Sequence, residues 1–300
     1  MIYSLTQPAR TAFCSFFRRA SSVRVIAIDH DGCFGLPFME PGDIEALHQP
    51  VVQHLLKDKQ PEDFVADYVT VFSNRQDAYR DMLNAYHHQN NLAFPVAKTL
   101  AKLLKACFDP LLLADISQHH KPGFTINWMN HAARVDGLNL AHESAPNSFL
   151  VKQLNNISRR HSQLVFSTDK INILYAQTHR LALFHPRQII YFHVYDDLKK
   201  EVLTPLMHFY QRFPQLIPAN VYVVLHHFDT VTNHHQSPNS FLPVKFAAIK
   251  GQGNIDNQYY DTVNKMSEIA CQVEGDQSQY HLHQYLTPSD LETTIEYGLH

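Results

Sequence analysis

Continuous apolar runs alternate along the chain with stretches of helical spacing, and this alternation predicts the secondary structure. Runs rich in β-branched residues indicate strands buried on both faces of a parallel sheet. We assign strands to residues 23–28, 67–72, 111–116, 188–195 and 220–228, and a hairpin to 241–251. Helices are expected at 41–59, 76–88, 98–108, 170–184, 198–213 and 259–273. This order predicts an α/β fold, a Rossmann-like parallel sheet with helices on both faces.

The segments between these elements define the expected domain boundaries. Residues 117–164 are mostly polar and contain turn signals, so we expect an irregular, partly helical insertion there, with helical stretches at 127–134 and 148–159. The expected boundaries are 1–22 for an N-terminal extension, 23–116 and 165–275 for the core, 117–164 for the cap-like insertion and 276–300 for a loosely attached C-terminal tail.

Composition narrows the class of protein. Hydrophobic residues make up 45% of the chain, enough to bury a substantial core and to exclude a disordered protein. The net charge of −3 lacks the basic footprint of a nucleic-acid binder. The four cysteines are widely spaced, which favours a reduced, cytoplasmic compartment over a disulfide scaffold. No apolar stretch approaches the roughly 18 residues that a membrane span needs.

Polar side chains cluster where predicted strands end. Three pairs follow strands directly: Asp29 and Asp31, Ser73 and Asn74, and Asp196 and Asp197. Ligands of open parallel sheets bind at the carboxyl ends of the strands, so these pairs are expected to meet. Four carboxylates at one edge repel one another unless a cation neutralises them, and oxygen ligands favour Mg²⁺. The histidines contain no H-E-x-x-H pattern, and we do not expect a zinc site.

Such a site suits phosphoryl transfer. Mg²⁺ beside a hydroxyl, a lysine and backbone N–H groups matches the charged oxygens of a phosphoryl group. An aspartate can attack phosphorus and form an aspartyl-phosphate. A second carboxyl two residues later can protonate the leaving oxygen and then activate water. Taken singly, each of these residues is more typical of a turn or a helix cap than of a site, and only their joint order at strand ends points to a site.

Residues 23–228 resemble the haloacid dehalogenase-like (HAD) superfamily. The resemblance lies in the order of four motifs: D-H-D-G, S-N, a lysine that opens a helix, and D-D. The resemblance implies that Asp29 is the nucleophile and Asp31 the general acid/base. It further implies a phosphate site and a Mg²⁺ site: Ser73, Asn74 and Lys170 for the phosphate, and Asp29, Asp31 (through its backbone carbonyl), Asp196 and Asp197 for the metal. Cys33 departs from the family pattern, which usually has Thr or Val there.

Three lysines are candidates for the role of neutralising the phosphate. Lys170 opens the helix before the acidic strand, which is where the family places its phosphate-neutralising lysine. Lys121 and Lys152 in the insertion are competing candidates, and the sequence leaves the choice open.

The second aspartate of D-H-D-G is typical of the phosphatases and phosphotransferases of this superfamily. We therefore expect a Mg²⁺-dependent phosphatase. The insertion after Ser73 is too irregular to enclose a small substrate, which favours a phosphoprotein, and phosphotyrosine could pack against Trp128 or Phe34. The alternatives are a non-catalytic HAD-fold binding module, or a phosphatase or phosphotransferase acting on a small phosphometabolite. The composition, rich in His, Asn and Gln and poor in Gly, also resembles secreted effectors of intracellular bacterial pathogens, which implies delivery into a host cell.

Overall fold

The computed structural model describes most of the expected core. The residues described are 22–35, 49–57, 64–78, 80–81, 84, 92–135, 167, 169–229, 242–274, 282–287 and 289–290. The helix expected at 148–159 lies outside them, as do most of the helix expected at 76–88 and almost all of the N-terminal extension. None of the helices in these ranges is both long enough and apolar enough to cross a membrane.

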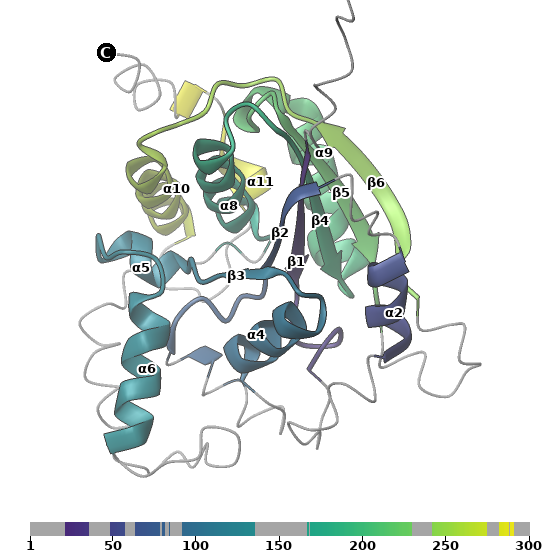
Figure 1. Cartoon of the computed structure of the whole chain (residues 1–300). Helices are drawn as coiled ribbons and strands as arrows, with labels where there is room; N and C mark the ends of the chain where they lie inside the picture. The colour runs from purple at the N-terminus through teal and green to yellow at the C-terminus, as the bar shows by residue number, and fades with distance from the viewer. Residues whose placement is uncertain are drawn as a thin grey trace, which may run out of the picture.

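A six-stranded sheet forms the centre of the molecule (Figure 1). Its strands lie in the order β3-β2-β1-β4-β5-β6, and all neighbouring pairs are parallel except β5 and β6. The strands are β1 (Ser22–Ile28), β2 (Phe64–Val71), β3 (Cys107–Asp109), β4 (Ile189–Asp196), β5 (Val221–His227) and β6 (Val244–Lys250). The predicted α/β class with a mostly parallel sheet is confirmed.

Helices pack against the sheet through two separate hydrophobic clusters. Successive side chains of a strand point to opposite faces. On β1, Val25 and Ala27 join a cluster with Leu174, whereas Ile26 and Ile28 join a second cluster. The helices are α2 (Gln49–Lys57), α4 (Ala93–Leu103), α5 (Leu113–Ser117), α6 (Phe124–Val135), α8 (Ile171–Phe184), α9 (Thr204–Arg212), α10 (Tyr259–Glu274) and α11 (Leu282–Tyr285), and the turns are a π-helical one (Lys199–Leu203) and a 3₁₀ one (Pro214–Leu216).

The prediction of a strand at residues 111–116 is wrong. The third strand is Cys107–Asp109, at the end of the segment predicted as a helix, and Leu113–Ser117 forms helix α5 instead. A short apolar run does not by itself distinguish a strand from a buried helix. Here Asp115 favours the helix. Its carboxylate accepts hydrogen bonds from the backbone N–H groups of Gly123 (2.8 Å) and Thr125 (2.9 Å) and so holds the helical turn in place.

Two further segments near the C-terminus differ from expectation. The hairpin predicted at 241–251 is a single strand, β6, because its backbone pairs with β5 rather than with itself. The expected loose tail contributes to the core: Leu282 and Leu286 are buried in the cluster that includes α8. The backbone N–H of His283 also donates to Asp169 Oδ2 at 2.9 Å, which ties this segment to the start of α8.

Candidate active site

The ends of β1, β2 and β4 lie side by side at one edge of the sheet. β1 is the central strand of this group: the chain passes from β1 to β2 and β3 on one side and then crosses to β4 on the other side. The N–H of Phe72 donates to the carbonyl of Ile28 at 2.7 Å, and the N–H of Asp29 donates to that of Tyr195 at 2.9 Å. Such a reversal of strand order opens a crevice where α/β proteins bind ligands.

Lys170 joins the carboxylates that follow β1 and β4. Its Nζ donates to Asp29 Oδ1 at 2.8 Å and to Asp196 Oδ2 at 2.6 Å, and all three side chains are almost completely buried. Burial alone would lower the pKa of Lys170, but the charges of Asp196 and Asp29 outweigh it and raise that pKa. The lysine therefore stays a cation inside the site.

Lys170 also has an unusual backbone. It precedes the first turn of α8 with φ of 59°, in the left-handed region. For a residue other than glycine this conformation costs about 1 kcal/mol or more, and it persists only where the surroundings enforce it. Here it directs a long side chain from the start of α8 into the cluster of carboxylates.

The site carries more negative than positive charge. Burial, reinforced by the neighbouring carboxylates of Asp196 and Asp31, raises the pKa of Asp29 to about 7 despite the opposing effect of Lys170. Burial and the charges of Asp29 and Asp196 raise the pKa of Asp197 to about 8. One lysine thus faces three clustered carboxylates, which hold protons near neutral pH unless a bound cation takes the place of those protons.

Gly32 allows Asp197 to approach the loop after β1. Gly32 has φ of 76°, and a Cβ built there would lie 2.1 Å from Asp197 Oδ2, closer than any real contact. A side chain at this position would therefore displace Asp197 from the cluster. The glycine of the D-H-D-G motif is needed both for the turn and for the space it leaves.

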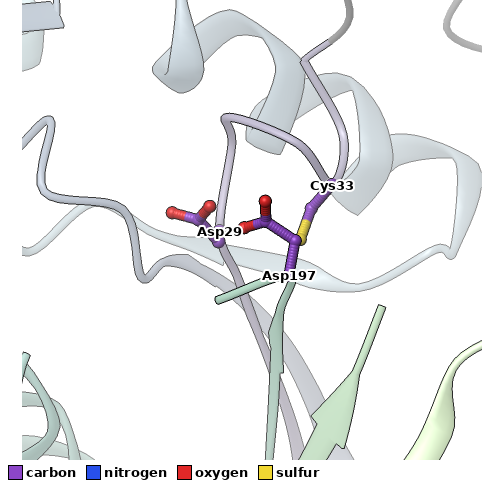
Figure 2. A group of neighbouring side chains, drawn as sticks. All are labelled: Asp29, Cys33 and Asp197. Carbon is purple, nitrogen blue, oxygen red and sulfur yellow. The ribbon is translucent and has the colours of Figure 1, made fainter. Parts of the chain in front are cut away.

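Asp29 and Asp197 form a possible cation site together with Cys33 (Figure 2). One ligand atom from each of these three residues lies within 4.8 Å of the others. Oδ1 of Asp197 is buried and has no hydrogen-bond partner within the described part of the chain. A buried carboxylate oxygen without a donor is costly, and a cation would satisfy it.

The thiol of Cys33 makes it a poor ligand. Its Sγ donates to the carbonyl oxygen of Phe228 at 3.0 Å. Burial raises the pKa of this thiol well above its ordinary value, and the charge of Asp29 raises it further. A soft metal would have to displace the thiol proton of Cys33, whereas a hard cation needs only the two carboxylates, so Asp29 and Asp197 suit a hard cation.

Asp31 is held by a residue that the sequence analysis did not single out. Arg75 donates from Nε to Asp31 Oδ2 at 3.0 Å and from its terminal nitrogen to Asp31 Oδ1, which makes a bidentate ion pair. The same guanidinium forms an ion pair with Asp81 at 3.2 Å. A cation directly after the S-N pair, in a predicted cluster of acids, was the signal that could have identified Arg75.

Ser73 and Asn74 occupy the loop between β2 and Arg75. Ser73 is buried, and its carbonyl accepts a hydrogen bond from Gln76 Nε2 at 2.7 Å. Oε1 of Gln76 accepts from the N–H of Leu113 at 3.1 Å, so this side chain anchors the loop to α5. Oδ1 of Asn74 is buried with no hydrogen-bond partner among the described residues.

The structure brings most of the predicted site residues together. Asp29, Lys170 and Asp196 are in direct contact, and Asp197 lies beside Asp29. The carboxylates of Asp31 and Asp196 belong to ion pairs with Arg75 and Lys170 and are not part of the three-residue cation group. Of the competing lysines, Lys121 is exposed ahead of α6, and Lys152 lies outside the described residues.

No protein-family model, curated protein or solved structure matches this chain. The site must therefore be interpreted from its own geometry.

Proposed function

We propose that the protein is a Mg²⁺-dependent phosphatase with a HAD-like core that works through an aspartyl-phosphate. The observation that carries this proposal is the buried Lys170, which bridges the carboxylates after β1 and β4 while Asp197 lies next to Asp29. A carboxylate nucleophile, a fixed cation and a second carboxylate for a metal are the groups that phosphoryl transfer requires. The strand order also agrees with that of doubly wound, Rossmann-like sheets.

In the first step, a carboxylate oxygen of Asp29 attacks phosphorus. A bond forms between Asp29 and phosphorus while the bond from phosphorus to the ester oxygen breaks. Asp31, two residues later on the loop, enters this step protonated and gives its proton to the departing oxygen. Lys170 lies 2.8 Å from Asp29 Oδ1, close enough to balance the negative charge that the phosphoryl group brings.

In the second step, water attacks the phosphorus of the aspartyl-phosphate. Asp31, now unprotonated, takes a proton from that water, and the bond between phosphorus and Asp29 breaks. Ser73 and the backbone N–H of Asn74, at the end of β2, are the proposed donors to the phosphoryl oxygens. Inorganic phosphate leaves, and Asp29 returns to its initial state.

The residues present fit a Mg²⁺ ion. Asp29 and Asp197 would hold it, because their carboxylates converge and Asp197 Oδ1 has no other partner among the described residues. When bound, the ion would neutralise charge on the transferring phosphoryl group. Its remaining ligands would be water and the backbone carbonyl of Asp31, since hard cations of this size keep several waters. Asp196 would act indirectly, by holding Lys170.

The depth of the nucleophile favours phosphotyrosine as substrate. The side chain of Asp29 is only 6% exposed, whereas that of Asp31 is 35% exposed. Phosphotyrosine extends furthest from its backbone and so reaches a recessed carboxylate best. Phe34 is completely buried against Phe228 and is unavailable to the substrate ring, contrary to expectation, while Trp128 on α6 is only partly buried.

Release of phosphate from an aryl phosphate tests the proposal. With Mg²⁺ present, the wild-type protein should hydrolyse 4-nitrophenyl phosphate, and Asp29→Asn should remove that turnover while the protein remains folded. Asp109→Asn is the matched control, because Asp109 is a buried carboxylate at the end of β3 that pairs with Arg180. Turnover by a folded Asp29→Asn protein, or its absence in the wild type, would refute the mechanism.

A further inference from the structure

Arg75 connects the loop after β1 to the loop after β2. Its side chain is completely buried, and its guanidinium binds both carboxylate oxygens of Asp31. The third nitrogen of the same guanidinium lies 3.2 Å from Asp81 Oδ1. That oxygen also accepts the backbone N–H of Ala93, the first residue of α4, at 2.8 Å. A continuous chain of hydrogen bonds therefore runs from α4 through Arg75 to Asp31.

We propose that Arg75 is the positioning residue of Asp31, fixing the carboxylate that transfers the proton in both steps. The inference rests on the proposed phosphatase function. Asp31 lies on a short loop and its side chain is partly exposed, so on its own it would sample several rotamers. A bidentate arginine fixes both the position and the plane of a carboxylate. As a carboxylic acid, Asp31 can accept from Arg75 through the lone pairs that face the guanidinium while its proton lies on the other side of one oxygen.

Arg75 is suited to this role because it is itself held in place. Burial alone would lower its pKa, but the carboxylates of Asp81 and Asp31 raise it, so it remains a cation. Its nitrogens are divided between the two acids, which leaves little freedom for rotation. Asp81 contributes by accepting from the guanidinium of Arg75 at 3.2 Å.

If Arg75 positions Asp31, the loss of kcat/KM caused by removing Arg75 should depend on the leaving group of the substrate. An alkyl oxygen, as in phosphoserine, must receive a proton as it departs, whereas a nitrophenolate leaves readily without one. Misplacement of a catalytic group by about 1 Å can reduce a rate about 100-fold. Loss of Arg75 should therefore reduce kcat/KM about 100-fold for a phosphoserine peptide but less than about fivefold for 4-nitrophenyl phosphate, because kcat/KM reports only the steps up to departure of the leaving group.

A double-mutant cycle separates positioning from a general structural effect. The variants are Arg75→Met, Asp31→Asn and the two combined, assayed on both substrates at fixed Mg²⁺. If Arg75 acts through Asp31, Arg75→Met lowers kcat/KM by less than about twofold once Asp31 is already asparagine. The kcat/KM of Arg75→Lys should lie between those of Arg75→Met and the wild type, because lysine restores the charge without the bidentate geometry.

Two additional variants serve as controls for effects on folding. Arg75→Met with Asp81→Asn removes the buried carboxylate that would otherwise lose its cation, and it should show the same substrate dependence. Arg24→Met removes a second buried bidentate pair, in which Arg24 binds both oxygens of Asp67 at 2.7 and 2.9 Å. Arg24 lies five residues before Asp29, about 16 Å along β1, so this variant should leave the ratio between substrates unchanged.

The outcomes are distinguishable. A selective loss on the phosphoserine peptide that disappears in the Asp31→Asn background supports the inference. Equal losses on both substrates, or the same loss in both backgrounds, overturn it while leaving the phosphatase proposal intact. A wild-type protein that hydrolyses neither substrate refutes the phosphatase proposal, and the role of Arg75 with it.

Discussion

Replacement of Lys170 by methionine tests the electrostatic structure of the site without assuming an activity. The change keeps a long apolar side chain but removes the cation that binds Asp29 and Asp196 at 2.8 and 2.6 Å. Removing one partner of a buried ion pair typically costs about 3–5 kcal/mol, because the other charge stays buried and unpaired. Because two carboxylates remain buried without their cation, we expect the free energy of unfolding to fall by about 4 kcal/mol at pH 8 without divalent cations.

The loss of stability in Lys170→Met should be larger at high pH than at low pH. Burial raises the pKa of Asp29 from its ordinary value of 3.8 to about 7 in the folded protein. Between about pH 4 and pH 7 the folded state therefore binds a proton that the unfolded chain has released, and stability falls as the pH rises. Lys170 opposes this fall because its charge lowers the pKa of Asp29. Its removal should therefore cost more at pH 8 than at pH 5.

Urea unfolding with a chelator present, at pH 5 and pH 8, measures both effects. With a slope of about 3 kcal/mol per M, the midpoint should fall by about 1–1.5 M at pH 8. The control is Lys98→Met on α4, an exposed position where a change within about 0.5 kcal/mol is expected. A loss below about 1 kcal/mol at pH 8, or a larger loss at pH 5, would refute this account of the site.

Three further predictions test the loop, the cation and the C-terminal segment. Gly32→Ala should cost about 1–2 kcal/mol through its left-handed backbone and weaken Mg²⁺ binding about tenfold in calorimetry, because the new Cβ displaces Asp197. Unchanged affinity would contradict that packing. Chelation should abolish phosphatase turnover, and Mg²⁺ but not Zn²⁺ should restore it; turnover that survives chelation excludes a required metal. Leu286→Ala should lower stability by about 2–5 kcal/mol in thermal unfolding, and an unaltered transition would show that this segment does not pack on the core.

Much of the sheet could be predicted because its strands are continuous apolar runs. Buried parallel strands need apolar side chains on both faces, and few other structures produce that pattern. Once β1 and β4 were located, Asp29 and Asp196 followed as the residues at their ends. The strand Cys107–Asp109 could not be found this way, because it is short and partly exposed, and only its pairing with Tyr68–Thr70 makes it a strand.

The contacts within the site depended on tertiary structure. Asp196 and Asp197 are neighbours in sequence, yet one carboxylate binds Lys170 and the other lies against Gly32, a difference that no spacing encodes. The choice of lysine depended on where α8 begins relative to the ends of β1 and β4. The ion pair between Arg75 and Asp31 joins residues 44 positions apart. Hydrophobic periodicity determines which strands form, whereas side chains from separate loops meet only after the strands are paired in register.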